Sequence, residues 1–240
     1  MNKFKSYHLG GIARKLNESN RLRTALAGFG LALIFTLVSA NAQGQVPLTS
    51  GAVTQSAAGD IIVPPVPDDL KIEAGNEVFL LGHGVGTQNY ICKPVGAGFR
   101  FVLFTPQATL FKENNKQIIT HFFGPNPEEP NADPTVVAEH QIRVAWQAQD
   151  SSSVWAKLHQ PNGAVIVDET AVPWLKLDAV GHLNGPTGGD TLSNVTFIQR
   201  LNTTGGLAPR EGCSVSTDVG NQAFIPYTAD YFFYRKISGN

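Results

Sequence analysis

The sequence has 240 residues, a formal net charge of −1 and only 15% charged residues, with 24 Gly and 15 Pro. Globular proteins usually carry roughly 25% charged residues, so this composition favours a turn-rich, extracellular type of chain and disfavours a helical bundle. Lys and Arg form no long run after residue 42. That absence argues against nucleic-acid binding, which depends on clustered basic side chains that neutralise phosphates.

The first 42 residues have the order of a secretory signal. A basic stretch, residues 1–23, precedes an apolar run of 14 residues, 25–38, and the small-residue cleavage motif Ala-Asn-Ala at 40–42. The run is shorter than the about 20 residues that span a bilayer, so we expect cleavage rather than a retained anchor. Cleavage removes six basic residues and one acidic residue and leaves a net charge of about −6. We therefore expect a secreted or periplasmic protein with no membrane contact after signal removal.

The rest of the chain is long enough for one domain with its own core. Residues 43–62 are small and polar, which predicts a flexible lead-in. Pro64, Pro65 and Pro67 then stiffen the chain, because each proline fixes its own φ angle. We place the start of the folded domain there, with bounds of 63–240.

Short β-branched and aromatic runs follow, separated by Gly, Pro, Asn and Asp. In one of them Ile142, Val144 and Trp146 alternate with more polar residues, which is typical of a strand with one buried face. The runs predict strands at residues 77–81, 88–92, 99–105, 108–111, 117–123, 141–148, 154–159, 174–179, 194–201 and 229–236. These strands predict an all-β, single-domain antiparallel fold, and their spacing leaves both a β-sandwich and a β-barrel open.

Three segments rich in glycine or proline predict turns and loops. The run Gly82–Gly86 (GHGVG) predicts a β-turn between two strands. It lacks the G-x-G-x-x-G spacing and a following βαβ unit, so it does not predict a dinucleotide site. Residues 124–133 and 181–190 predict long surface loops, where binding specificity often lies.

Cys92 and Cys213 are the only two cysteines. In an oxidising compartment a pair of thiols is normally joined, so we predict one disulfide that ties the first third of the chain to the last. No C-x-x-C motif is present, which argues against a redox pair or a local zinc site.

Several motifs together resemble a known family. In the first half they are residues 88–92 (QNYIC), 106–110 (PQATL) and 120–125 (THFFGP), and in the second half 172–177 (VPWLKL), 195–209 (VTFIQRLNTTGGLAP), Cys213 and 226–234 (PYTADYFFY). This set resembles the DUF3455 family, a group of exported proteins of unknown function. The resemblance covers about residues 64–236 and implies an exported location without an established reaction. After Gly124-Pro125 the chain departs from the family, because an acidic, proline-rich insertion follows where a tryptophan is usual.

Histidine and serine spacing predicts no local catalytic or metal motif. The five histidines after the leader form no H-x-H, H-x-x-H or H-E-x-x-H pair, and G-x-S-x-G is absent. His121 lies in a family motif, so we expect it to bind a ligand through a hydrogen bond or to act as a structural anchor.

Three further residues complete the candidate ligand site with His121. Alternation places Asp230 on the same face as Phe232 and Tyr234, and a partly buried carboxylate needs a partner, for which we expect Arg200. This ion pair is expected to be structural or part of a pocket. Trp174, together with Trp146 and Trp155, is either a core residue or part of a platform that stacks on carbohydrate.

The sequence therefore predicts a non-catalytic binding module or an envelope-structural β-module, with no metal ion or cofactor. The candidate partner is a small molecule or a glycan, and the oligomeric state stays open. Asn194 and Asn202 are in glycosylation sequons, which matter only in a eukaryotic source. The alternative is a secreted hydrolase whose site is assembled from distant strands. A hydrolase should bring a His within about 2.6–3.2 Å of a Ser or carboxylate oxygen, whereas a binding module should show an apolar concavity with few polar groups.

Overall fold

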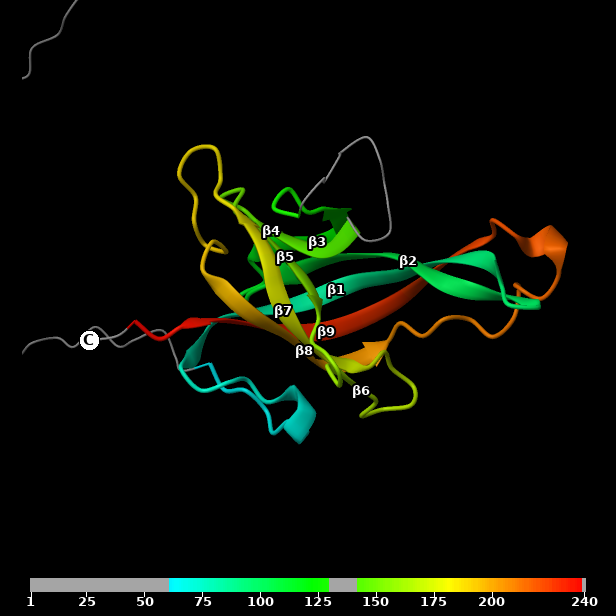
Figure 1. Cartoon of the computed structure of the whole chain (residues 1–240), viewed down its shortest axis with the longest axis horizontal. Coiled ribbons are helices and arrows are strands. Elements are labelled where there is room, and N and C mark those ends of the chain that lie inside the picture. Colours follow the sequence, from blue (N-terminus) through cyan, green and yellow to red (C-terminus); the bar gives the residue numbers. More distant parts are fainter. Residues whose placement is uncertain (1–60, 130–141, 239–240) are drawn as a thin grey trace, which may run out of the picture. The chain divides into compact units, whose positions relative to one another are not determined.

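A computed structural model shows an almost entirely β structure (Figure 1). It describes residues 61–129 and 142–238, so the expected signal segment lies outside the described residues. The strands are β1 (Asn76–Val95), β2 (Gly98–Phe111), β3 (Gln117–Pro125), β4 (Ile142–Ala148), β5 (Ser153–Leu158), β6 (Ala164–Val165), β7 (Trp174–Leu183), β8 (Val195–Gly205) and β9 (Gln222–Lys236). Within the described ranges the helices are two short 3₁₀ turns, η1 (Asp68–Leu70) and η2 (Ser216–Asp218).

Eight of the strands form a closed antiparallel barrel. They run side by side in the order β5-β4-β3-β2-β1-β9-β8-β7, and β5 pairs in turn with β7 from Ser153↔Leu183 to Leu158↔Leu177. The two-residue strand β6 lies on the outer edge of β7. The all-β prediction is confirmed, and of the two architectures left open the barrel is the correct one.

The predicted β-turn at Gly82–Gly86 is wrong, because this segment lies inside β1 and pairs with both β2 and β9. A Cβ atom on Gly84 would lie 2.8 Å from the ring of Tyr231, and one on Gly86 would lie 2.6 Å from Cα of Ala108. Glycine inside a strand often marks such a close approach. The glycines here make room for inward side chains and do not reverse the chain.

Other predicted boundaries also change. The strands expected at 77–81 and 88–92 are both part of β1, and those expected at 99–105 and 108–111 are both part of β2. β2 continues through Pro106 because that proline lies beside a register shift at Asn89/Tyr90, where a missing N–H is tolerated. The start of β9 and all of β6 were not predicted, and the loop expected at 181–190 begins only after β7 ends at Leu183.

The inward side chains form the main core, and its largest members include Trp146, Tyr231 and Phe233. A second apolar cluster lies on the outside of the barrel wall, where Leu70 packs with Leu201 and other residues of β8 and β9. Inward and outward positions alternate along each strand, so the two clusters occupy opposite faces of the same sheet.

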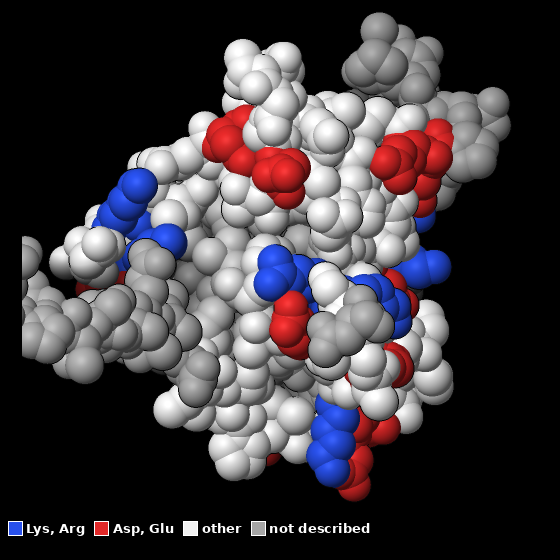
Figure 2. All heavy atoms as spheres, turned by 90° about the vertical axis from the view of Figure 1, so that its left-hand side faces the viewer, with Lys and Arg blue, Asp and Glu red and all other residues white. Residues whose placement is uncertain are grey.

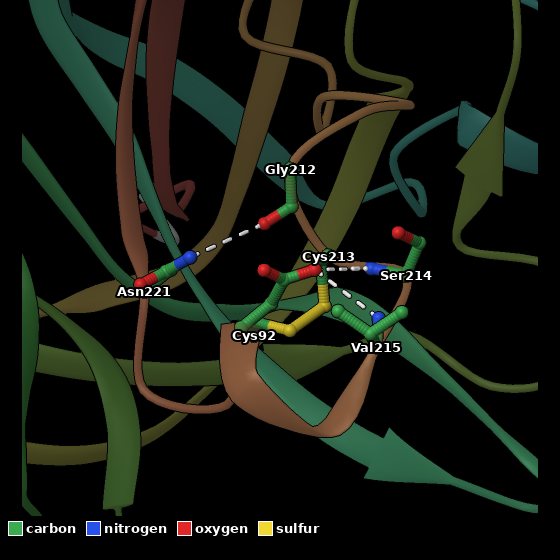
Figure 3. The surroundings of a disulfide bond; sticks show 7 residues. Cys92, Gly212, Cys213, Ser214, Val215 and Asn221 are labelled. Atoms are coloured by element: carbon green, nitrogen blue, oxygen red, sulfur yellow. Dashed lines mark hydrogen bonds between the residues drawn. A yellow bond between two sulfur atoms is a disulfide. The ribbon is translucent and has the colours of Figure 1, made fainter.

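The predicted disulfide between Cys92 and Cys213 is present and joins β1 to the connection between β8 and β9 (Figure 3). The main chain supports the same junction, since the Cys92 N–H donates to the carbonyl of Asn221 at 2.8 Å. On the other side of the bridge, the Asp218 carboxylate accepts the N–H of Ser214 at 2.8 Å. These contacts hold the β8–β9 connection against the end of β1.

The close approach at Gly86 gives a direct test of the barrel wall. Gly86→Ala should lower the free energy of unfolding by about 1–3 kcal/mol, because the new methyl group would lie 2.7 Å from Cβ of Ala108 and would also meet the main-chain oxygen of Gln107. Gly98→Ala is the control, since its Cβ would meet nothing within 4 Å. Urea unfolding of the two variants checks this, and equal stabilities would contradict it.

Removing the disulfide should destabilise the barrel. The bridge closes a loop of 121 residues, and removing a disulfide from a small secreted domain typically costs about 2–5 kcal/mol. We expect the double variant Cys92→Ala/Cys213→Ala to unfold at a correspondingly lower urea concentration than the oxidised wild type. Wild-type protein unfolded with a reductant is the control and should match the variant.

Candidate functional site

The barrel interior contains a cavity of 130 Å³. Its apolar wall consists of Leu103, Phe123, Val144, Leu175 and Leu177. Its polar wall consists of Gln88, His121, Trp146, Arg200 and Tyr231. An engineered cavity of roughly 150 Å³ holds benzene, so the space is sufficient for one small molecule.

The cavity reaches the surface where β2 and β3 part. Their ladder pairing ends at Ala108↔His121, after which β3 pairs with β4 alone and bonds β2 only through the Phe123 N–H, which donates to Thr105 Oγ1 at 3.1 Å. Leu103 of β2 lies beyond this point and lines the cavity while remaining 41% exposed. The gap between these two strands is therefore the mouth of the cavity.

His121 is buried in the cavity wall. Its Nδ1 lies 2.9 Å from the carbonyl oxygen of Ala145, and its ring stacks on Trp146 with centroids 4.3 Å apart. Burial lowers the pKa of His121 to about 3, although the bond to Ala145 opposes this shift. The imidazole is therefore neutral at pH 7, and the proton on Nδ1 leaves Nε2 as a hydrogen-bond acceptor.

Arg200 carries a permanent positive charge in the cavity wall, and it is only 9% exposed. Its Nε and Nη2 groups donate to the carbonyl oxygen of Pro173 at 3.3 and 2.8 Å. Within the described part of the chain no carboxylate forms an ion pair with it. Arg200 thus holds the segment before β7 in place and leaves its charge uncompensated.

The expected ion pair between Arg200 and Asp230 is wrong. Arg200 lies opposite Tyr231 in the β8–β9 register, whereas Asp230 lies one residue earlier and faces the other side of the sheet. Asp230 instead bonds His83 at 2.7 Å and accepts the side-chain amide of Asn202 at 2.8 Å, on the outside of the barrel. Arg200 and Asp230 lie on neighbouring strands, but successive residues of a strand face opposite sides of the sheet, so their side chains point away from each other.

Two tyrosines border the charge of Arg200. The hydroxyl groups of Tyr227 and Tyr231 lie 3.0 Å apart. Burial raises the pKa of both hydroxyls, while the positive charge of Arg200 opposes the rise. Both side chains are therefore neutral at pH 7.

Two buried donors in the polar wall have no hydrogen-bond partner in the described structure, namely Gln88 Nε2 and Trp146 Nε1. Gln88 is 2% exposed and Trp146 is 0% exposed. An unpaired buried donor costs about 1–3 kcal/mol, so such groups call for an explanation. Both residues line the cavity, where a bound molecule would supply the missing acceptors.

The structure brings together two of the four predicted ligand residues. His121 and Arg200 line the same cavity. Trp174 packs against the outer apolar cluster, and Asp230 lies on the outer face. Of the other tryptophans, Trp146 lies in the main core.

Sequence reasoning missed Gln88 and Tyr231 as candidate site residues. Both had a signal, because Gln88 opens the QNYIC motif and Tyr231 belongs to the inward set of β9 with Tyr227, Ala229 and Phe233. If the inward-facing residues of every predicted strand are considered together, Gln88 and Tyr231 fall in the same interior.

The geometry expected of a hydrolase is only half present. His83 bonds Asp230 and His159 bonds Asp178, each at 2.7 Å, which is the orienting half of a catalytic triad. Neither imidazole has a hydrogen bond from a Ser, Thr or Cys side chain within the described ranges, and Nε2 of His83 lies 3.7 Å from a carboxylate oxygen of Glu113. No group of three or more His, Cys, Asp or Glu side chains that could hold a metal ion occurs in residues 61–129 and 142–238.

Surface charge offers no rival site on the face that Figure 2 shows. Lys and Arg side chains there lie in small separate groups, several of them beside Asp or Glu.

A larger hollow of 640 Å³ lies beside the mouth of the cavity and is lined by residues that include Val85, Thr109, Phe122 and Phe224. Among the described residues, no Asp, Glu, Lys or Arg side chain lines this hollow, and its single histidine, His121, is neutral at pH 7.

The family described as protein of unknown function (DUF3455) matches residues 73–235, and the chain belongs to this family. The match confirms the resemblance found in the motifs. Comparison with curated proteins and with solved structures returned no match. No helix in the described residues is long and apolar enough to cross a membrane.

Burial of His121 predicts a pH dependence of stability. Its folded pKa of about 3 lies below the unfolded value of about 6.5, so below pH 6.5 the unfolded chain binds more protons than the folded one. The free energy of unfolding should fall on acidification by up to about 1.4 kcal/mol per pH unit from this residue.

Urea unfolding measured between about pH 6.5 and pH 4 checks this prediction. The wild type should lose more stability over that range than His121→Gln, which has no group to protonate at this position. Imidazole NMR signals of His121 that titrate near pH 6.5 in the folded protein would contradict it.

Proposed function

We propose that this protein is an exported, non-catalytic binding protein whose barrel interior holds one small molecule. The observation that carries the proposal is the cavity of 130 Å³, which combines an apolar wall with buried donors that have no partner. Ligand sites are typically concave and mostly apolar, with a few polar groups that fix the ligand's orientation.

The scaffold favours binding because its walls are already in place. The cavity lies inside a barrel whose strands are all paired around the ring, and side chains on strands are more precisely held than those on loops. The polar wall draws on β1, β3, β4, β8 and β9, so no single strand can move without disturbing several contacts. A preformed site avoids much of the ordering cost of association.

An exported location agrees with the disulfide. A buried cystine between Cys92 and Cys213 is compatible with an oxidising compartment outside the cytoplasm. The secretory pattern of residues 1–42 supports secretion or transport to the periplasm. Recovery of a mature chain that begins near residue 43 would test the signal directly.

The hydrolase alternative has less support. The imidazole in the cavity, His121, bonds a main-chain carbonyl through Nδ1 rather than a carboxylate. The two His–Asp pairs lie outside the cavity, and among residues 61–129 and 142–238 no Ser, Thr or Cys side chain bonds either imidazole. A site for covalent catalysis needs the nucleophile, the base and the orienting group within hydrogen-bond reach of one another.

Filling the cavity provides the test of binding. A thermal-shift panel of toluene, benzyl alcohol, benzamide, benzoate, butanoate and cellobiose should contain a compound that stabilises the wild type, by about 2.7 kcal/mol at 100 times its Kd. Val144→Phe should abolish that response, because Val144 lines the cavity.

Val167→Phe is the matched control, since Val167 is exposed, lines neither the cavity nor the neighbouring hollow, and receives the same added group. It should leave the response unchanged. The proposal is wrong if no compound stabilises the wild type, or if Val144→Phe responds to the same compound as strongly as the wild type does.

A further inference from the structure

The polar wall of the cavity contains one permanent charge and no opposite charge. The titratable groups near Arg200 are Tyr90, His121, Tyr227 and Tyr231, and each of them experiences its positive charge. All four are neutral at pH 7, and none is a carboxylate. The interior therefore has a charge of about +1 in the described structure, and in a low-dielectric site that charge is strongly felt.

A buried cation without a partner is costly for a folded protein. Desolvation of a charge costs several kcal/mol unless hydrogen bonds or an opposite charge offset it. The carbonyl of Pro173 uses two of the five N–H groups of Arg200, and the Tyr231 hydroxyl lies within hydrogen-bonding reach of a third, which leaves two N–H groups on the guanidinium. An anion in the cavity would offset the cost, and a planar guanidinium suits a carboxylate because it can donate two parallel hydrogen bonds.

Further donors belong to residues that line the same space. Gln88 and Trp146 line the cavity and are almost fully buried, and Gln88 Nε2 and Trp146 Nε1 have no hydrogen-bond partner in the described structure. Together with the guanidinium they form a set of N–H groups that outnumbers the one imidazole acceptor in the wall, Nε2 of His121. The molecule that satisfies this set must present acceptor oxygens, ideally with a negative charge.

The remaining wall selects for an organic molecule. Phe123, Val144, Leu175 and Leu177 offer only apolar surface, which an inorganic ion would leave uncovered. A small body with one ionised head matches both walls, and the volume of 130 Å³ limits the body to about the size of a benzene ring.

We infer that the ligand of this cavity is a small organic monocarboxylate, whose carboxylate is bound by Arg200 with help from the N–H donors of Gln88 and Trp146. The inference rests on the proposed function, which assigns the cavity as a binding site. It adds the chemical class of the ligand and the residues that select it.

Calorimetric titration with benzoate and benzamide tests the inference, because the two differ little in shape but differ in charge. The wild type should bind benzoate at least about tenfold more tightly, as expected for hydrogen bonds to a charged group. Equal affinities would overturn the inference and leave the binding function intact. Binding of neither compound, and of no other compound in the panel, would overturn both and indicate a cavity filled by water only.

Gln88→Glu tests the role of Arg200 without removing it. The new carboxylate would lie in the cavity wall and neutralise the positive charge, so benzoate affinity should fall at least about tenfold while benzamide affinity is kept. Gln117→Glu is the control, because Gln117 is exposed and lines neither the cavity nor the neighbouring hollow. Unchanged benzoate binding by Gln88→Glu would overturn the inference.

Two more measurements keep the test decisive. If Gln88→Glu does not fold, Arg200→Gln replaces it, and this variant should bind benzoate no more tightly than benzamide. Titration with sodium chloride and inorganic phosphate separates an organic ligand from an inorganic one. Either salt displacing benzoate at a concentration equal to that of benzoate would show that the apolar wall contributes nothing, and would overturn the assignment of an organic acid.

Discussion

Pairing of β5 with β7 is the constraint on which the rest of the structure depends. Without it the sheet would be open, and inward side chains on strands distant in sequence would not share an enclosed space. Closure gives every inward position a neighbour across the lumen, so the volumes of those side chains must be matched. Gly84 and Gly86 of β1 have no Cβ atom, so Tyr231 and Ala108 can approach the strand closely and the lumen can accommodate large aromatic residues.

The same closure explains why polar groups can persist in the interior. His121 remains neutral and is anchored to a main-chain carbonyl, and the two tyrosine hydroxyls bond one another. The Nδ1–H of His121 and the two tyrosine hydroxyls have partners within the wall, whereas Arg200, Gln88 and Trp146 retain donors that the wall does not satisfy. The contrast between satisfied and unsatisfied groups separates the part of the polar wall that supports the fold from the part available to a ligand.

Local sequence patterns predicted the strand content, the alternation on β4 and the disulfide, because each depends on residue type and period alone. They did not predict that Gly82–Gly86 is a strand interior, since close packing against Tyr231 depends on residues nearly 150 positions away. The ion pair of Arg200 with Asp230 failed for a related reason. The two residues do lie on neighbouring strands, β8 and β9, but the side of the sheet that each residue faces depends on register, which sequence spacing does not define.

Alternation also bears on how this family can diversify. Positions that face the lumen and positions that face outward occupy the same strands but share few contacts, so they can change independently during evolution. Under the proposed binding function, a substitution at position 200 or 88 would change the ligand that the interior binds without changing the outer face. Chains of this fold with the same outer face could then differ in their ligand, and the residues at these two positions would be the first to compare.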